Sequence, residues 1–226
     1  MYRKIMEYLK KWKESKYRKP LILQGARQVG KTYTALEFGR EYYENVAYFN
    51  FETNPSLNKT FDENITPDYL IPILSHIAGV TIVSEKTLIV FDEIQLCERA
   101  LTSLKYFCEN APQYHIIVAG SLLGVAVNRS TFSFPVGKVD IKTMYPMDIE
   151  EFMIAMGNKD LTEMIRKSFE SNAPMPAALH DICMQLYRQY LVVGECLNVF
   201  HFLHKQKIMC LFDIIKTQFL QVILMI

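Results

Sequence analysis

The chain has 226 residues, half of them hydrophobic and 22% charged, and its formal net charge is +1. This composition is typical of a soluble globular protein, and the length allows a full α/β core with a small appendage. The five cysteines show neither Cys-x-x-Cys spacing nor a nearby histidine pair. That pattern argues against a zinc site or a disulfide framework and predicts reduced thiols in a cytoplasmic protein. No apolar signal-peptide segment opens the sequence.

Positive charge is concentrated in residues 1–19. Eight basic and two acidic side chains there give +6, so the rest of the chain carries −5. Ile5, Leu9 and Trp12 recur at helical spacing and predict an amphipathic helix packed on the domain that follows. In one interpretation the charge is a solvated lysine-rich face. In the other it contacts nucleic acid or another polyanion, and such binding must weaken as the salt concentration rises.

Residues 25–32 match the phosphate-binding P-loop pattern G-x-x-x-x-G-K-[ST]. The apolar segment 21–24 precedes them and an amphipathic run follows, so the order is strand, glycine loop, helix. Glycines let successive backbone N–H groups point at a β-phosphate, and the helix adds the positive end of its dipole. Lys31 is expected to reach the β- and γ-phosphates, and the Thr32 hydroxyl to ligate Mg²⁺. The predicted nucleotide-contacting residues are Gly25, Ala26, Arg27, Gln28, Val29, Gly30, Lys31, Thr32 and Tyr33.

The segment after the P-loop helix predicts a strand and then helical structure. Residues 46–51 have the character of a strand, and residues 56–79 that of a helix. Pro67 and Pro72 are expected to break this helix, because proline removes a backbone donor and its ring clashes with the preceding turn.

Residues 87–91 form a continuous apolar run that ends in Asp92 and Glu93. A strand that is apolar on both faces suits the centre of a parallel sheet, and carboxylates at its C-terminal end lie where such sheets bind ligands. Asp92 is expected to hold Mg²⁺ through water, and Glu93 to be the general base that polarises the attacking water. An exposed acidic turn is the alternative, and the P-loop upstream argues against it.

The next predicted elements are a helix over residues 101–110 and a buried strand over residues 114–120, which ends at Ser121. In P-loop ATPases a polar residue at this strand tip contacts the γ-phosphate or the water, so Ser121 is the predicted catalytic sensor. Capping of the segment 122–127 is the alternative, and the two roles are compatible. A short final strand is predicted over residues 136–142. Helices then follow over residues 147–156, 160–171 and 177–193.

Four segments resemble a prokaryotic ATP-binding family of the AAA+ superfamily: LILQGARQVGKTYTALEFG, LIVFDEIQ, HIIVAGSLLGVAV and SFPVGKVDIKTMYPMDIEEF. Members of this family carry an ATPase domain followed by a C-terminal domain of unknown function. The resemblance extends over roughly residues 15 to 194. It implies an α/β fold, the three-layer P-loop NTPase sandwich with a parallel sheet of strand order 5-1-4-3-2. In that order the strand carrying the Asp-Glu pair is separated from the P-loop strand.

The resemblance also implies roles for particular residues. It gives the roles argued above to Lys31, Thr32, Asp92, Glu93 and Ser121. This chain has Gly-Lys at residues 137–138, where many relatives have Gly-Arg. An arginine at this position could sense phosphate, so Lys138 departs from the family pattern. Arg129 is an alternative cation, or a solvated loop charge. Because AAA+ relatives often complete the site in trans, the resemblance implies a homo-oligomer or a trans-acting subunit.

Residues 195–226 depart from the family pattern. Relatives continue as Gly-x-Pro-Glu and open a second domain, whereas this chain continues from Gly194 as Gly-Glu-Cys-Leu-Asn-Val-Phe. Loss of one base from a gene for Gly-Gly-Met-Pro-Glu-Cys-Val gives this sequence, so our hypothesis is a frameshifted remnant of a lost domain. A genuine short variant with a hydrophobic docking helix is the alternative. Asp213 and Lys216 argue against a membrane span in this apolar tail.

The expected organisation is a basic helix (1–19), an ATPase core (20–145), a helical appendage (146–194) and the tail. The expected function is Mg²⁺-dependent hydrolysis of ATP to ADP and phosphate. The alternative is an ATP-dependent switch that docks on DNA or protein with little turnover. GTP is rejected, because the nearest match to the guanine-reading Asn-Lys-x-Asp, at residues 158–160, has its acid one position too early.

Overall fold

The computed structural model describes residues 2–120 and 135–193, and the chain divides into two compact units. One unit is Lys4–Tyr145. The other joins Met1–Arg3 to Pro146–Ile226. The chain therefore passes between the units twice, after Arg3 and after Tyr145.

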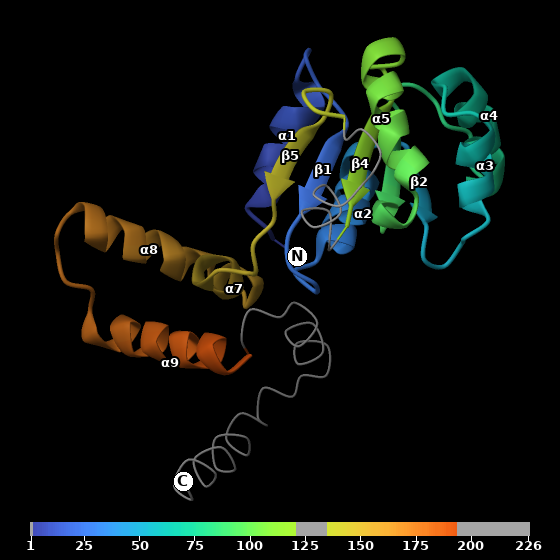
Figure 1. The fold of residues 1–226 in the computed structure, drawn as a ribbon. Helices are drawn as coiled ribbons and strands as arrows, with labels where there is room; N and C mark the ends of the chain where they lie inside the picture. Colours follow the sequence, from blue (N-terminus) through green and yellow to red (C-terminus); the bar gives the residue numbers. More distant parts are fainter. Residues whose placement is uncertain (1, 121–134, 194–226) are drawn as a thin grey trace, which may run out of the picture. The chain divides into compact units, whose positions relative to one another are not determined.

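The unit Lys4–Tyr145 is a five-stranded sheet with helices (Figure 1). Each of β1, β2 and β3 is followed by at least one helix, which is the chain order of an α/β protein. Its described elements are α1 (Ile5–Glu14), β1 (Leu21–Gln24), α2 (Lys31–Tyr42), β2 (Asn45–Asn50), α3 (Leu57–Glu63), α4 (Pro67–Ala78), β3 (Thr87–Asp92), the short 3-10 helix η1 (Ile94–Leu96), α5 (Glu98–Asn110), β4 (His115–Ala119) and β5 (Asp140–Thr143).

All pairs of neighbouring strands are parallel, and the strand order is β2-β3-β4-β1-β5. This confirms the predicted order 5-1-4-3-2 and the α/β fold class. Strand β4 separates β3, which ends in Asp92, from β1, which leads into the glycine loop. Because all strands run the same way, Asp92 and the glycine loop lie at the same, C-terminal edge of the sheet.

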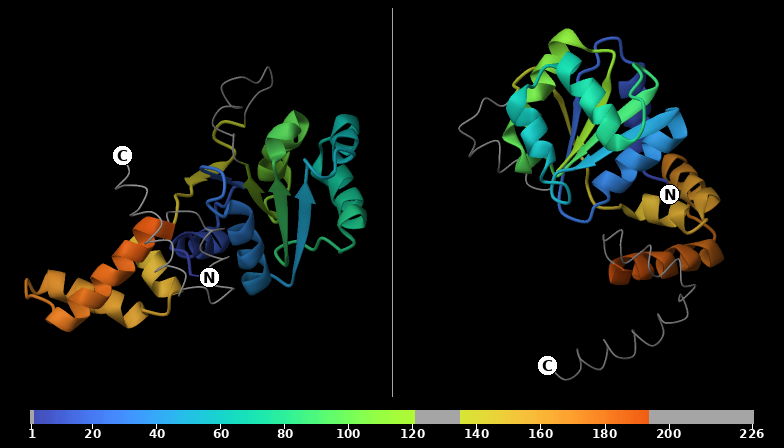
Figure 2. Two further views of the ribbon diagram at one scale, coloured as in Figure 1. Left: turned by 90° about the horizontal axis from the view of Figure 1, so that it is seen from below. Right: turned by 90° about the vertical axis from the view of Figure 1, so that its right-hand side faces the viewer.

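The sheet is covered on both faces, which gives three layers (Figure 2). Alternate residues of β3 point to opposite faces. Leu88 and Val90 pack with α1 and α2, whereas Ile89 and Phe91 pack with α3, α4 and α5. Every residue of β3 and β4 is buried, as expected for central strands of a covered parallel sheet.

Helix α1 packs on the sheet through Leu9 and Trp12, which are both buried. Some of the basic side chains near this helix make contacts within the unit. The ammonium of Lys13 lies 4.3 Å from the centre of the Tyr43 ring. The Arg18 guanidinium donates to the Lys13 carbonyl at 2.7 Å and lies 6.0 Å from the centre of the Trp12 ring. These contacts stabilise the packing of the N-terminal segment, and nucleic-acid binding by it stays a prediction.

A buried histidine lies beneath this segment. His115, the first residue of β4, is only 3% exposed, and its Nδ1 lies 2.6 Å from the Tyr43 hydroxyl. The Trp12 ring meets the imidazole edge-on. Burial, together with the positive charges of Arg18 and Lys13, lowers the pKa of His115 from 6.5 to about 3. The folded protein therefore keeps this ring neutral.

We expect His115 to make the fold sensitive to acid. The unfolded chain takes up a proton below the ordinary pKa of about 6.5, whereas the folded protein does so only near 3. The contribution is fully present above the unfolded pKa and is lost as the pH falls through this window. The free energy of unfolding should fall by about 2 kcal/mol between about pH 7.5 and about pH 5 through this residue alone.

Urea unfolding over a pH series measures this dependence. His115→Phe should flatten the slope, and His76→Gln, which changes an exposed histidine, should leave it as in the wild type. An unchanged slope in His115→Phe would contradict the interpretation.

The structure differs most from the predicted elements at three places. The break expected at Pro72 is wrong, because α4 continues through it, with Leu70 and Leu74 of the same helix fully buried. Helix α5 begins three residues before Leu101, at Glu98. The last strand begins later than residue 136, since the amide of Lys138 donates to the carbonyl of Pro135 at 3.0 Å and forms a turn.

The second unit contains the helices α7 (Ile149–Ala155), α8 (Lys159–Glu170) and α9 (Ala177–Val193). Met153, Leu161 and Leu186 form its small buried core. The helices agree in kind with the three predicted over residues 147–193, and they begin within two residues of the expected positions.

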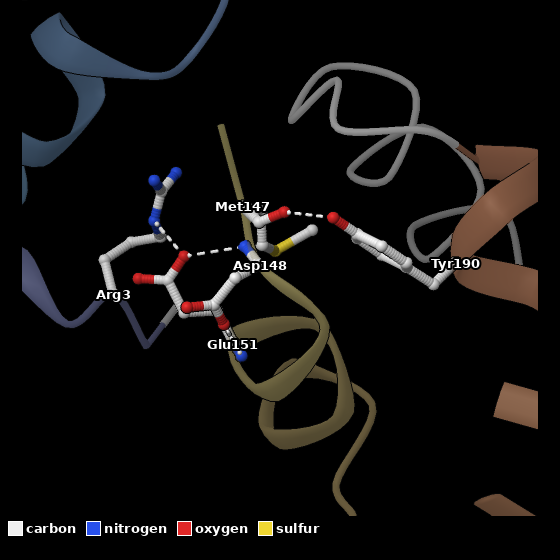
Figure 3. A network of polar contacts seen from close by, with 5 residues as sticks. All are labelled: Arg3, Met147, Asp148, Glu151 and Tyr190. Carbon is white, nitrogen blue, oxygen red and sulfur yellow. Dashed lines mark hydrogen bonds and ion pairs between the residues drawn. The ribbon is translucent and has the colours of Figure 1, made fainter. Parts of the chain in front are cut away.

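The start of α7 lies in a polar network (Figure 3). The amide of Glu151 donates to Asp148 Oδ1 at 2.8 Å, and the amide of Asp148 donates back to Glu151 Oε2 at 3.2 Å, which is a capping box. Arg3 Nε lies 3.2 Å from the same Glu151 oxygen, and both side chains are almost fully buried. Tyr190 of α9 donates to the Met147 carbonyl at 3.1 Å. These contacts fix Arg3 and α9 to the beginning of α7.

Several other predictions can be compared with the structure only in part. Among residues 2–120 and 135–193, no helix is long and apolar enough to cross a membrane. Cys97, Cys108 and Cys183 are free thiols, and burial raises the pKa of each. The frameshift hypothesis concerns residues 195–226, which lie outside the described residues. The domain boundaries given above stay predictions.

Candidate nucleotide-binding site

The glycine loop joins β1 to α2 and has an unusual backbone. Gly25 has a φ of +149°, and Gly30, immediately before α2, has a φ of +88°. Gln28 also has a positive φ, +65°, a conformation that is uncommon for residues with a side chain. Residues 26–28 are exposed, while Val29 is buried and anchors the loop. The loop therefore curls in front of the N-terminus of α2, where backbone N–H groups and the helix dipole favour an anion.

Gly25 is required by a close approach as well as by its φ. A Cβ at this position would lie 2.2 Å from the carbonyl oxygen of Met144, a backbone atom that cannot swing away. We therefore expect Gly25→Ala to lower the free energy of unfolding by more than about 3 kcal/mol, beyond the 1–2 kcal/mol that a left-handed conformation alone costs an alanine.

Chemical denaturation of the two proteins measures this effect. Gly79→Ala is the matched control, because Gly79 also has a positive φ, +66°, but a Cβ placed there would have no described atom within 4 Å. Equal losses of stability in the two variants would show that the close approach to Met144 does not add to the cost of a side chain at residue 25.

Lys31 is held inside the loop. Its Nζ donates to the carbonyls of Gly25 at 2.9 Å and Ala26 at 2.7 Å, and the residue is 7% exposed. Burial lowers the pKa of this lysine, while the negative charges of Glu93 and Asp92 act in the opposite sense. Because the ammonium lies within the loop, it is in a position to contact an anion bound there.

Thr32 and Asp92, which lie far apart in the sequence, meet at this edge of the sheet. The Thr32 hydroxyl lies 3.0 Å from Asp92 Oδ1 and 3.1 Å from Oδ2. Helix α2 supplies the threonine and the end of β3 supplies the aspartate, so the contact depends on the parallel strand order. A hydroxyl and a carboxylate are oxygen ligands of the kind that Mg²⁺ prefers. The structure thus brings together the two residues predicted to hold the metal.

Glu93 follows Asp92 in a left-handed backbone conformation, with φ +52° and ψ +40°. Its amide donates to the carbonyl of Ala119 at 2.9 Å, which ties it to the adjacent strand β4. Its half-buried carboxylate accepts a hydrogen bond from the side-chain amide of Gln95. A residue with a side chain is strained in this conformation, and such strain is common at functional sites.

Two residues of the site were missed by the sequence analysis. The Tyr48 hydroxyl donates to Asp92 Oδ2 at 2.8 Å, and the Asn50 amide donates to the same oxygen at 3.3 Å. The pKa of Tyr48 is raised to about 12, chiefly by burial; the hydrogen bond with Asn50 lowers this pKa and the one with Asp92 raises it. Only the register of the two strands reveals that these residues belong to the site, because Asn50 lies directly opposite Asp92 in the β2–β3 ladder.

Of the remaining predicted residues, Lys138 lies away from this site. Lys138 precedes β5, at the opposite edge of the sheet from the glycine loop, since Asp140 pairs with Leu21 at the start of β1. Its Nζ lies 2.9 Å from the carboxylate of Glu109. Ser121 and the cation Arg129 lie outside the described residues. Tyr33 lies in the first turn of α2 and is partly buried.

The sheet order and the loop between β1 and α2 define the fold of a P-loop nucleoside triphosphatase. Residues 17–153 match the model of a family described as an AAA domain. This match covers more than half of the chain, and the chain belongs to that family. No curated protein matches the sequence.

Several solved structures share the general fold. PCH-2 from C. elegans is 14% identical, with 77% of this chain and 48% of that chain covered and a TM-score of 0.39. The Drosophila ORC bound to DNA is 16% identical, with coverages of 84% and 53% and a TM-score of 0.44. A variant of RuvB from Thermotoga maritima is 14% identical, with coverages of 84% and 70% and a TM-score of 0.41. The chain spans about half the length of the first two, and likenesses this distant carry no argument about function.

Proposed function

We propose that this chain binds Mg-ATP at the glycine loop and hydrolyses it to ADP and phosphate. The observation that carries the proposal is the contact between Thr32 and Asp92 at 3.0 and 3.1 Å, beside the buried ammonium of Lys31. Three residue types that a phosphoryl-transfer site needs are thus within one small region. The membership in an AAA-domain family supports the same class of function.

The residues present suit a magnesium ion. Thr32 and Asp92 would hold it, the aspartate through water, because their oxygens already converge. When bound, Mg²⁺ offsets the negative charge of the phosphate oxygens. No cluster of three or more His, Cys, Asp or Glu side chains occurs in the described part of the chain, which suits an ion held jointly with the nucleotide instead of by the protein alone.

The other residues bind and orient the reactants. The loop N–H groups and Lys31 would hold the phosphates, with the lysine moving from the carbonyls of Gly25 and Ala26 to phosphate oxygens. Glu93 would accept the proton of the attacking water through its carboxylate. Because its backbone is fixed by the hydrogen bond to Ala119, its position depends on β4 as well as β3.

A second candidate function is an ATP-dependent switch with little turnover. One observation favours it: the Glu93 carboxylate is engaged by the Gln95 amide, and a base so engaged is less available to water. In that case ATP occupancy, not hydrolysis, would control docking to DNA or protein. Both functions require ATP binding, and both allow a second copy of the chain to complete the site.

Calorimetric titration with ATP and with GTP tests the shared requirement. We expect ATP to bind in the presence of Mg²⁺ and GTP to bind at least about 10-fold more weakly, a difference of about 1.4 kcal/mol. The choice of adenine rests on the absence of Asn-Lys-x-Asp from the sequence. No binding of either nucleotide would overturn the proposal, and tighter binding of GTP would overturn its choice of base.

A further inference from the structure

The carboxylate of Asp92 receives hydrogen bonds from three directions. The Thr32 hydroxyl lies within 3.1 Å of both oxygens, and the amide of Glu93 donates to Oδ1 at 3.2 Å. From β2, Tyr48 and Asn50 donate to Oδ2 at 2.8 and 3.3 Å. The Tyr48 hydroxyl makes the shortest of these contacts. Strand β2 therefore contributes to the orientation of a side chain at the end of β3.

The sequence of β2 explains how Tyr48 reaches this position. Alternation along the strand buries Ala47 and Phe49 in the core, while Tyr48 and Asn50 share the other face. Tyr48 is 38% exposed, so its ring contributes less to the core than its neighbours do. Its hydroxyl makes the specific contacts, donating to Asp92 and accepting from the Asn50 amide at 3.2 Å.

Asn50 makes this arrangement rigid. Its side-chain oxygen accepts from the amides of Glu52 and Thr53, both at 2.9 Å, while its nitrogen donates to Tyr48 and Asp92. The asparagine is thus fixed by the turn that follows β2. The phenol is held in turn by the asparagine, so neither donor can rotate away from Asp92 without losing other hydrogen bonds.

We propose that Tyr48 is a positioning residue for magnesium: by holding Oδ2 of Asp92, it keeps the carboxylate facing Thr32 and so sets the affinity of the nucleotide site for Mg²⁺. This inference rests on the proposed function. Residues that orient a metal-binding carboxylate typically change metal affinity 10- to 100-fold when they are removed. Among the described residues, the hydrogen-bond partners of the Tyr48 hydroxyl are Asp92 and Asn50, so its effect is expected in the metal requirement.

The experiment compares Tyr48→Phe with the wild type by measuring ATP binding over a Mg²⁺ titration and in the presence of a chelator. Loss of the hydroxyl should raise the Mg²⁺ concentration at half-saturation about 10-fold, while affinity for ATP without Mg²⁺ stays unchanged. Tyr69→Phe is the matched control, because the Tyr69 hydroxyl also donates to a carboxylate, that of Glu63, away from the site. Melting temperatures of both variants report whether either has lost its fold.

Two results distinguish failure of this inference from failure of the proposed function. If the wild type shows no Mg²⁺-dependent binding of ATP, the proposed function is wrong. If the wild type binds but Tyr48→Phe has the same Mg²⁺ requirement as Tyr69→Phe, only the role of Tyr48 is overturned.

A second measurement needs no nucleotide. In protein labelled with 3-fluorotyrosine, the ¹⁹F resonance of Tyr48 is the one missing from Tyr48→Phe. Asp92→Asn should shift this resonance and leave that of Tyr69 in place, because Tyr48 donates to the altered side chain whereas Tyr69 donates to Glu63. An unmoved Tyr48 resonance would show that the contact is absent in solution and would overturn the proposal.

Discussion

Glu93→Gln should abolish turnover while leaving ATP bound. Removing a general base typically lowers kcat about 10²- to 10⁴-fold. Glutamine has the same shape, and its carbonyl oxygen can still accept from Gln95, so the local backbone and the affinity for Mg-ATP should be retained. Phosphate release and calorimetric ATP binding, measured on the same preparation, separate the two quantities.

This variant also separates the two proposed functions. Glu98→Gln, which alters an exposed carboxylate at the start of α5, is the control and should behave as the wild type. If Glu93→Gln loses hydrolysis, the chain is an ATPase with Glu93 as its base. If the wild type binds ATP without hydrolysis and the variant loses nothing, the switch is the correct account.

Lys31→Ala should lose ATP binding itself. The ammonium is the cation that the structure places inside the glycine loop, and each hydrogen bond from a charged group is worth about 1.5–3 kcal/mol. Loss of two such bonds to phosphate should weaken ATP binding at least about 100-fold. Calorimetric titration with Mg-ATP measures this loss directly.

The control for Lys31→Ala is Lys138→Ala. Lys138 pairs with the carboxylate of Glu109 and lies at the opposite end of the strands from the glycine loop. Its removal should leave ATP affinity within about twofold of the wild type, less than about 0.5 kcal/mol. If Lys31→Ala binds ATP as tightly as Lys138→Ala, the glycine loop is not the nucleotide site.

Much of the core was predictable because its signals are local. The runs 87–91 and 114–120 are apolar on both faces, and the structure places both as buried central strands. The glycine pattern at residues 25–32 likewise fixes a loop between a strand and a helix. The order of the strands could not be predicted from local signals, because it depends on pairings between distant segments. It was predicted only from the family resemblance.

The parts that were missed depend on tertiary contacts. Tyr48 and Asn50 look like ordinary residues of a predicted strand, and only the register of β2 against β3 makes them partners of Asp92. Pro72 does not end its helix, although local rules predict a break, because burial of Leu74 beyond it favours continuation. Such outcomes depend on packing that a short sequence window does not contain.

The most direct test of the central claim is phosphate release from purified wild-type protein with and without Mg²⁺, beside Glu93→Gln purified in the same way. We predict Mg²⁺-dependent release of phosphate from ATP by the wild type and none above background by the variant. Equal release by the two proteins would point to a contaminating ATPase and contradict the assignment of Glu93. Bound ATP that the wild type never hydrolyses would contradict the ATPase itself.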